Sequence, residues 1–245
     1  MFRPSTSQFF LRNSNTAGNA DLTFTLGQAG DIPVAGDWNG DGIDDAGVFR
    51  PAAGQFLLRV PGVSFVCNPV CHPVFTVTTI TINFGVPGDL PVAGDWNGDG
   101  IDTPGVFRNG QFLLTNGPNT NNSSPPVNFT ANFGAAGDLP VAGDWNGDGI
   151  DSIGVFEPSF GVFLLSNSNT SGAIDFTFVF GAAEDLPLAG DWNGDGVDTI
   201  GTFRPSVAQF FLNNINDDFN ANLTLIFNFG ATGDQPIGGD WNGKP

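Results

Sequence analysis

The stretch PVAGDWNGDGID occupies positions 33–44 and returns at positions 91–102 and 140–151. A close variant, PLAGDWNGDGVD, fills positions 187–198, and a shortened copy, PIGGDWNGKP, forms positions 236–245. The aspartate that opens each DWN triplet falls at positions 37, 95, 144, 191 and 240, at intervals of 58, 49, 47 and 49 residues. Because a steady period of this length is typical of repeat architectures, the sequence indicates five copies of one structural unit.

The composition is that of a folded, acidic protein. The net charge is −18 at pH 7, and this balance disfavours nucleic acid and anionic membranes as partners, because both bind clustered Lys and Arg. The 25 Phe and 5 Trp residues supply material for a core, which argues against disorder. No apolar run approaches the ~18 residues of a membrane span, and no signal peptide is visible. Met1 stands inside a repeat, which leaves room for further sequence upstream.

Each unit contains four short apolar runs separated by turn residues. In the first unit these runs span residues 32–38, 47–50, 55–59 and 75–84. Phe, Val, Ile and Thr dominate them with partial two-residue alternation, which indicates strands. Four strands every 40 to 50 residues or so are typical of a β-propeller blade. The PVAG run has the smallest side chains, so we place it innermost, with the Phe-rich strands filling the space between blades.

The sequence therefore predicts an all-β fold and a single domain over residues 1–245. We expect a five-bladed β-propeller of four-stranded antiparallel blades, whose last blade is closed by the N- and C-terminal segments. Pairing the two ends in one sheet leaves no exposed edge. The same complementarity acting between chains would instead give a head-to-tail filament. The blades are predicted at residues 32–84, 90–133, 139–180, 186–229, and 235–245 together with 2–26.

The DWNGDGID turn places oxygen-bearing residues at alternate positions. In the first copy Asp37, Asn39 and Asp41 hold positions 1, 3 and 5, and Ile43 offers its carbonyl oxygen at position 7. Gly42 at position 6 permits the sharp turn that gathers these oxygens, as in the first half of a calcium loop. Hard oxygen ligands without nearby His or Cys favour Ca²⁺ over zinc or copper. The equivalent predicted ligands are Asp95, Asn97, Asp99 and Ile101; Asp144, Asn146, Asp148 and Ile150; and Asp191, Asn193, Asp195 and Val197.

On these residues the chain resembles the integrin-alpha-like FG-GAP and VCBS repeat family. The resemblance covers all five units and includes NFG at 132–134 and 228–230, the PVAGDWNGDG stretch, and GVFRP at 47–51. It implies a calcium-binding propeller with an ion in the turn between the first and second strands of each blade. The family's loop usually closes with Asp at position 9, and this chain departs from that pattern. Position 9 is Asp45 in the first loop but Thr103, Ser152 and Thr199 in the others.

Position 8 is Asp in all four complete loops, at Asp44, Asp102, Asp151 and Asp198. Either the loop closes one residue early and this carboxylate binds the ion, which we favour, or the carboxylate hydrogen-bonds the turn and water completes the shell. Ordinary metal-free Asp/Asn/Gly turns are the alternative to calcium, but four acidic loops in register favour ions that offset the repulsion between carboxylates. The fifth loop has Lys244 at position 5, whose charge repels calcium. The sequence thus predicts four Ca²⁺ ions, one per complete loop.

Three further sets of residues carry weaker signals. Cys67 and Cys71 lie in an insertion of the first unit and predict a disulfide in an exported protein, with free thiols as the alternative. His72 follows them and is interpreted as a loop residue; haem attachment is disfavoured because three residues separate the cysteines. The position-2 tryptophans are expected to pack each loop against the next blade: Trp38, Trp96, Trp145, Trp192 and Trp241. Four arginines are expected to pair with nearby Asp: Arg3, Arg50, Arg108 and Arg204.

Three classes of function compete. The repeated blades and the resemblance favour a non-catalytic calcium-binding propeller for extracellular adhesion, surface assembly or filament building. Its partner would be a protein or glycan at a cell surface, or copies of itself by strand exchange, with no membrane insertion. A carbohydrate-binding lectin propeller is the alternative. A glycoside hydrolase is less favoured, because that chemistry needs two unlike carboxylates and only Glu157 and Glu184 stand outside the Asp pattern. Calcium availability and the Cys pair favour a location outside the cell or on its surface.

Overall fold

The computed structural model describes residues 1–67, 70–215 and 223–243, which form strands and turns without a helix. No segment in these ranges is therefore a helix that could cross a membrane. The strands are β1 (Phe2–Arg3), β2 (Gln8–Leu11), β3 (Leu22–Thr25), β4 (Ile32–Gly36), β5 (Asp45–Arg50), β6 (Gln55–Cys67), β7 (Cys71–Asn83), β8 (Leu90–Gly94), β9 (Thr103–Arg108), β10 (Gln111–Leu114), β11 (Phe129–Asn132), β12 (Leu139–Gly143), β13 (Ser152–Glu157), β14 (Val162–Leu165), β15 (Phe176–Val179), β16 (Leu186–Gly190), β17 (Thr199–Arg204), β18 (Gln209–Asn213) and β19 (Leu223–Asn228).

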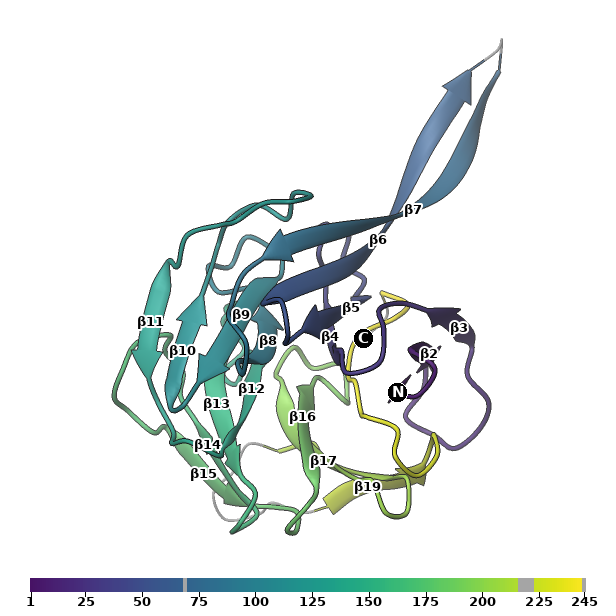
Figure 1. The fold of residues 1–245 in the computed structure, drawn as a ribbon. Coiled ribbons are helices and arrows are strands. Elements are labelled where there is room, and N and C mark those ends of the chain that lie inside the picture. The colour runs from purple at the N-terminus through teal and green to yellow at the C-terminus, as the bar shows by residue number, and fades with distance from the viewer. Residues whose placement is uncertain (68–69, 216–222, 244–245) are drawn as a thin grey trace.

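The strands form five antiparallel sheets arranged around an axis (Figure 1). Four sheets have four strands each, in the orders β4-β5-β6-β7, β8-β9-β10-β11, β12-β13-β14-β15 and β16-β17-β18-β19. We call these sheets blades 1 to 4. Blade 5 has the order β1-β2-β3 and is completed by the C-terminal segment, where Gln235 and Phe2 exchange two backbone hydrogen bonds of 2.8 Å. The predicted five-bladed β-propeller is confirmed, and the two ends of the chain meet within one molecule.

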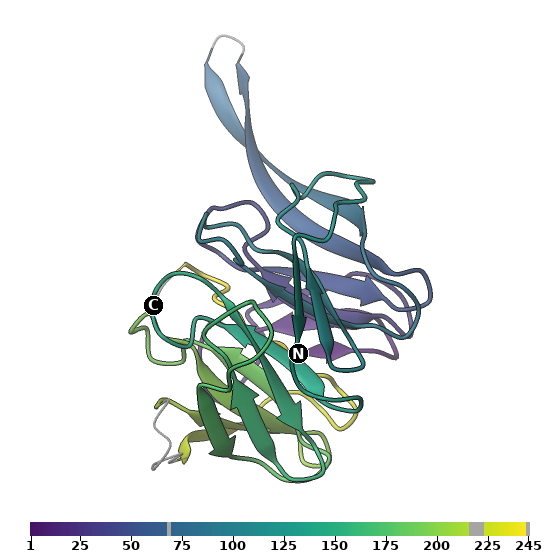
Figure 2. The same ribbon diagram turned by 90° about the vertical axis from the view of Figure 1, so that its left-hand side faces the viewer.

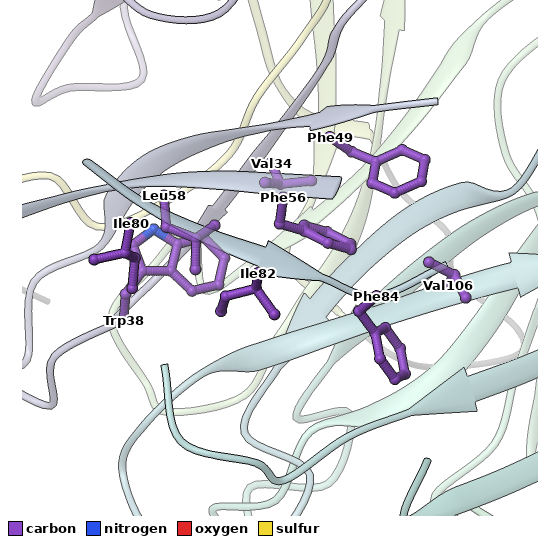
Figure 3. Close-up of a cluster of buried hydrophobic side chains, with 9 residues drawn as sticks. All are labelled: Val34, Trp38, Phe49, Phe56, Leu58, Ile80, Ile82, Phe84 and Val106. Carbon is purple, nitrogen blue, oxygen red and sulfur yellow. The ribbon is translucent and has the colours of Figure 1, made fainter. Parts of the chain in front are cut away.

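The hydrophobic core is divided among the five junctions between blades. The cluster in Figure 3 joins Phe49 and Phe56 of blade 1 to Val106 of blade 2. At the seam, Met1 of blade 5 packs among residues of blade 4, and Val48 of blade 1 packs among residues of blade 5. Every blade also repeats one tilted pair of Phe rings, with centroids 4.7–4.9 Å apart. Because each cluster draws on two blades, a blade buries its apolar faces only inside the closed ring.

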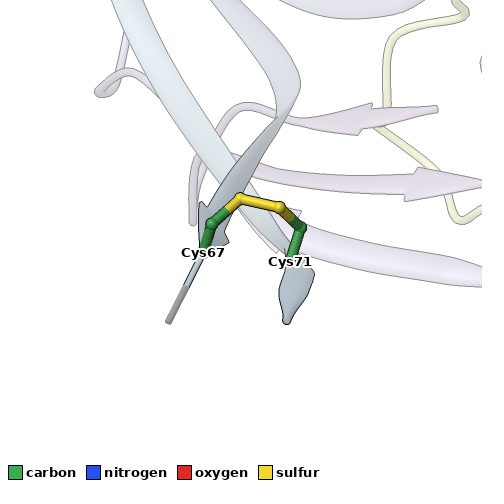
Figure 4. The surroundings of a disulfide bond; sticks show 2 residues. All are labelled: Cys67 and Cys71. Carbon is green, nitrogen blue, oxygen red and sulfur yellow. A yellow bond between two sulfur atoms is a disulfide. The ribbon is translucent and has the colours of Figure 1, made fainter. Parts of the chain in front are cut away.

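Blade 1 carries an arm that leaves the ring. Strands β6 and β7 are 13 residues long and pair without interruption from Gln55↔Asn83 to Cys67↔Cys71. Figures 1 and 2 show the hairpin projecting from the ring, and Figure 4 shows the disulfide that joins Cys67 and Cys71 near its end. His72 lies in β7, so its interpretation as a loop residue is wrong: the flanking residues are rich in Val, Phe and Thr, which continue the ladder.

The predicted pairing of arginine with aspartate is confirmed in four blades. Each Arg ends the second strand of its blade and binds, through two nitrogens, the Asp that precedes the inner strand. Nitrogen–oxygen distances are 2.6–3.1 Å. The pairs are Arg3–Asp234, Arg50–Asp31, Arg108–Asp89 and Arg204–Asp185. In blade 3 the same two places hold Glu157 and Asp138, so two acids stand where the other blades have an ion pair.

Replacing Glu157 with Arg should restore the missing ion pair. Asp138 is only 8% exposed and accepts the N–H of Ala135 at 2.7 Å, as its counterparts do in other blades. A two-nitrogen pair with this buried carboxylate should raise the free energy of unfolding by about 1 kcal/mol, after allowance for the exposure of the guanidinium. Thermal melts would measure the gain. Glu157→Gln is the control for merely removing the negative charge, and a gain of the same size in that variant would contradict the ion-pair explanation.

Replacing Glu184 with Gly should also stabilise the ring. The φ angle of Glu184 is +71°, whereas the corresponding positions in the other units are glycines with φ of +88° to +99°. The left-handed conformation costs a residue with a Cβ about 1–2 kcal/mol. Glycine avoids this cost, but its greater conformational freedom in the unfolded chain offsets part of the gain in stability. We expect a net gain of about 0.5 to 1 kcal/mol in a denaturant titration. Glu184→Ala keeps the strain and should give no gain.

Candidate metal centres

Each acidic loop connects the first strand of a blade to the second and folds around its position-1 carboxylate. In the first loop Asp37 accepts the backbone N–H of Gly40 at Oδ1 and that of Gly42 at Oδ2, both at 2.7 Å. The Oδ1 atom of Asn39 accepts the N–H of Asp41 at 3.0 Å. The Asp41 carboxylate in turn accepts the N–H of position 7 at 3.0 Å. The three side chains predicted as ligands are thereby drawn toward one turn.

The same hydrogen bonds recur in all four complete loops. The position-1 carboxylate accepts the position-4 N–H at 2.7–2.8 Å and the position-6 N–H at 2.7 Å every time. The position-5 carboxylate accepts the position-7 N–H at 3.0 Å in each loop. The sequence repeat is therefore matched by a repeat of geometry, and the predicted ligands of one loop lie together in each of the four blades.

The donor set of each loop fits a hard cation. Within the described ranges, no three His, Cys, Asp or Glu side chains form a metal-binding group, since a loop offers two carboxylates with one carboxamide and a carbonyl. Such an all-oxygen set suits Ca²⁺ and not zinc. Positions 1 and 5 form no ion pair with Arg within the same ranges. Their carboxylates accept backbone N–H groups and, at position 5, the Nδ2 of the position-3 Asn at 2.9–3.1 Å. These donors carry no full positive charge, which leaves the loops suited to a cation.

The position-8 aspartates reach across to the neighbouring blade. The Oδ2 atom of Asp102 accepts the backbone N–H of Asp37 at 2.8 Å, and the backbone N–H of Asp102 binds the Asp37 carbonyl at 2.9 Å. Asp151, Asp198 and Asp44 make the same two bonds to Asp95, Asp144 and Asp240. Of the two predicted roles for position 8, the hydrogen bond to a turn is present, but the turn belongs to the preceding blade. We call each pair of bonds an inter-blade latch.

The last latch closes the ring at the seam. The Oδ2 atom of Asp44, in the first loop, accepts the backbone N–H of Asp240, in the fifth loop, at 2.6 Å. The two residues are 196 positions apart in the chain. The fifth loop is described through Gly243, and Lys244, for which the sequence predicts repulsion of calcium, lies outside the described residues. Latches thus join blades 1 to 2, 2 to 3, 3 to 4 and 5 to 1.

Adjacent loops are also packed against each other. A Cβ added at Gly40 would lie 3.1 Å from the Ile101 side chain of the next loop, and the same contact recurs at three other junctions at 3.1–3.2 Å. A Cβ at Gly36 would lie 2.7 Å from Asp102 Oδ2 and 2.9 Å from the Trp38 ring. These positions favour glycine because the side chains of the next loop lie too close for a Cβ. The conformation of one loop is therefore coupled to that of its neighbour.

Two asparagines brace the loops from the connections between the third and fourth strands, a role that the sequence analysis missed. The Nδ2 atom of Asn119 donates to the carbonyls of Trp38 and Asp102, at 3.1 and 2.7 Å. Asn169 donates to the carbonyl of Asp151 at 2.7 Å. The Asn-Thr pair that recurs at 15–16, 119–120 and 169–170 is the signal that could have indicated these residues.

Position 9 differs between the first loop and the others, as the sequence indicates. Asp45 is 6% exposed, and burial, followed by the nearby charge of Asp41, raises the pKa of its carboxyl to about 7. In the second loop Thr103 instead donates from Oγ1 to the carbonyl of Thr115 at 2.6 Å. The fourth blade has Thr199 at this place, which donates to the carbonyl of Gly190 at 3.4 Å. The hydroxyls of Thr103 and Thr199 thus donate to carbonyls of their own blades.

A cavity of about 360 Å³ lies on the axis beside the four position-8 carboxylates. Burial raises the pKa of Asp44 to about 6 and that of Asp198 to about 7, and it raises the pKa values of Asp102 and Asp151 well above the ordinary range. The cavity is also lined by Trp192, Trp241, Asn242 and the residues from Arg12 to Asn15. Within the described chain, Trp192 Nε1 and Asn242 Oδ1 are buried atoms without a hydrogen-bond partner.

The tryptophans fall into two groups. Trp38, Trp96 and Trp145 are 2–3% exposed and belong to the clusters between blades, which confirms the predicted packing role. Trp192 and Trp241, which flank the seam, are only partly buried and border the axial cavity.

The comparisons with known proteins add a fold-level likeness. No protein-family model matches the chain, and no curated protein matches it. Among solved structures, an Agrocybe aegerita lectin that recognises non-reducing terminal N-acetylglucosamine is similar, at 15% identity and a TM-score of 0.43. The match covers 85% of this chain and 56% of the lectin, so this chain spans about half of that protein.

Proposed function

We propose that the chain is a non-catalytic, calcium-stabilised propeller that presents a rigid surface to a partner outside the cell. The observation that carries the proposal is the common geometry of four loops, each gathering two carboxylates, a carboxamide and a carbonyl without a basic partner in the described residues. A bound Ca²⁺ would supply the positive charge that these loops lack. The residues that would hold it are positions 1, 3, 5 and 7 of each loop.

The latches explain what an ion would do for the ring. Asp37 lies in the first loop and also offers its backbone N–H and carbonyl to Asp102 of the next blade. Ordering one loop therefore orders the place where the neighbouring blade attaches. Calcium would act on the junctions between blades, and not on a reacting group. The disulfide of Cys67 and Cys71 supports an oxidising, calcium-rich location outside the cell.

Calorimetric titration of the chelator-treated protein with Ca²⁺ tests the proposal. We expect close to four sites per chain, one for each complete loop. Asp99→Asn removes the position-5 charge of the second loop and should lower the stoichiometry by one. Asp21→Asn, which changes an exposed acid outside the loops, should leave it unchanged. A titration without heat and without any change in intrinsic Trp fluorescence would refute the proposal.

A lectin is the second candidate, and the axial cavity is the observation that favours it. Its volume of about 360 Å³ lies within the range of small-ligand sites. Two Trp rings, of Trp192 and Trp241, border the cavity beside polar residues such as Asn13 and Asn15, and together they offer the apolar face and the hydrogen-bonding groups that a saccharide uses. Screening against immobilised glycans would test this. Trp192→Ala removes the ring that borders the cavity, and it should abolish any saccharide binding seen with the unaltered chain.

A further inference from the structure

The arm formed by residues 60–67 and 70–78 carries no Asp, Glu, Lys or Arg side chain, whereas the whole chain carries a net charge of −18. Eight residue pairs run from Val60↔Thr78 to Cys67↔Cys71, so the arm extends about 23 Å at ~3.3 Å per residue. Figures 1 and 2 both show it standing clear of the ring.

The two faces of the arm differ in chemistry. Pairs directly opposite each other share a face, so Pro61↔Val77, Val63↔Phe75 and the disulfide lie on one side. Phe75 is 78% exposed, and Val63 and Val77 are 56% and 55% exposed. The other side carries Thr76 and Ser64, whose hydroxyls lie 3.4 Å from carbonyls of the opposite strand. One face is therefore apolar and exposed, and the other mixes these hydroxyls with valines such as Val74, which is 39% exposed.

The apolar face continues a surface that is covered at the base of the arm. There Leu57 packs against the core of blade 5, and the Arg59 guanidinium lies 4.4 Å from the centre of the Phe24 ring. Beyond Arg59 the carbonyl of Pro61 still accepts Asn39 Nδ2 at 3.3 Å, and farther out the same face is exposed, at 56% for Val63 and 55% for Val77. A two-stranded ribbon with an uncovered apolar face is marginally stable in water, so this surface indicates a partner.

We infer that the arm is a self-association element, whose apolar face packs against the apolar face of the arm on a second copy of this chain. Two copies repel each other through their acidic bodies, but an arm of about 23 Å holds those bodies farther apart than the Debye length of about 8–10 Å. A lipid bilayer is a poorer occupant, because both edges of the ribbon expose backbone groups that hydrocarbon cannot satisfy. A charged partner finds no opposite charge on the arm.

The area of the arm sets the strength of this contact. A face about 23 Å long and ~10 Å wide gives about 230 Å² per copy, or about 460 Å² in total. This is well below the ~1,200 Å² of a stable complex, so the dimer is weak and depends on concentration. Weak contacts of this kind act through multiplicity, for instance when many copies stand on one surface. The inference rests on the arm alone and does not require calcium.

Sedimentation equilibrium over a range of protein concentrations tests the inference. The unaltered chain should shift from monomer toward dimer as concentration rises, and NaCl added above about 0.1 M should change the shift little, because the acidic bodies already lie beyond the Debye length. Val63→Ser combined with Phe75→Ser should raise the dissociation constant at least tenfold. Phe160→Ser is the matched control, because Phe160 is 74% exposed but lies in the turn between β13 and β14. Thermal melts would check that each variant keeps the fold of its parent.

The outcomes separate this contact from its competitors. A chain that is monomeric at every concentration would overturn the inference, and so would equal weakening by Phe160→Ser. Association that survives the arm variant would point to strand exchange between termini. Binding of the unaltered chain to uncharged phosphatidylcholine vesicles without self-association would assign the arm to lipid instead. Loss of calcium binding with arm association intact would refute the proposed function and leave this inference standing.

Discussion

Chelation of calcium with EGTA should lower the melting temperature by roughly 10 to 20 °C. An ion that binds only the folded state, at a free concentration ten times its dissociation constant, adds about 1.4 kcal/mol per site. Dissociation constants of about 0.1 mM are typical of extracellular calcium modules, so 1 mM Ca²⁺ meets this condition. Four loops would then contribute about 5 to 6 kcal/mol, and each kcal/mol shifts the melting temperature of a chain of this size by about 2–4 °C.

The experiment has an internal control in the loops themselves. Asp99→Ala disables one loop and should remove roughly a quarter of the calcium-dependent shift, or more if the packed loops act cooperatively. Asp21→Ala, at an exposed acid that accepts the N–H of Asn13, should leave the shift unchanged. A change in melting temperature of less than about one or two degrees on chelation would show that calcium does not stabilise this protein. The turns would then be ordinary hydrogen-bonded turns, as their backbone contacts alone permit.

Asp198→Asn should stabilise the calcium-free protein by about 1 to 3 kcal/mol at pH 8. Burial raises the pKa of Asp198 to about 7, so at pH 8 the folded state holds a carboxylate that its surroundings disfavour. Each pKa unit corresponds to about 1.4 kcal/mol, and the lower part of the range allows for partial exposure of the side chain. Asparagine keeps an oxygen that can accept the N–H of Asp144, which Asp198 Oδ2 now accepts at 2.9 Å. Thermal melts in EGTA would measure the gain.

The raised pKa values of Asp44 and Asp198 predict how the stability of the calcium-free protein depends on pH. An unfolded Asp titrates near pH 4, whereas the folded pKa values of Asp44 and Asp198 are about 6 and about 7. Between these limits the folded state keeps protons that the unfolded state has lost, so its stability falls as pH rises from about 4 to about 7. Asp198→Asn should flatten this slope. A slope of the opposite sign over that window would contradict the assigned burial.

Adding calcium to Asp198→Asn decides between the two roles considered for position 8. If the carboxylate serves only as an inter-blade latch, the variant should bind calcium as tightly as the unaltered chain. If position 8 is also a ligand of its own loop, the affinity of the fourth loop should fall while the others are unchanged. The measurement is a calorimetric titration of both proteins, and Asp175→Asn, an exposed acid outside the loops, serves as the reference.

The number and order of the blades could be predicted from the sequence because they depend on local patterns that are written five times. PVAG is short and small, and it forms an inner strand wherever it occurs. The Phe-rich strands then fill the junctions, where their rings belong to clusters that include residues of the next blade. Closure at the seam followed from counting strands at the two ends of the chain. The pairing of Arg50 with Asp31, and of its counterparts, was also accessible, because both residues recur in fixed register.

The partners of the position-8 carboxylates could not be predicted, because they lie in other blades. Asp102 is a predicted ligand of its own loop, yet its carboxylate accepts the backbone N–H of Asp37, which is 65 residues away. Only the rotation from one blade to the next decides which turn a side chain reaches, and no local pattern encodes that rotation. The bracing asparagines and the axial cavity arise in the same way. The direction of the arm could not be predicted either. Its base packs against blade 5, but the pairing of β6 with β7 continues beyond that blade.

The sequence by itself thus determined the repeating unit, its strands, the count of five and the oxygen-rich loops, since each is fixed by residues close together in the chain. The tertiary structure alone decided that the loops meet at four of the junctions between blades, that position 8 joins neighbouring blades there, and that one apolar face lies open on the arm. The first two features depend on contacts between segments about 50 or more residues apart, which come together only when the ring closes and buries the junctions between blades.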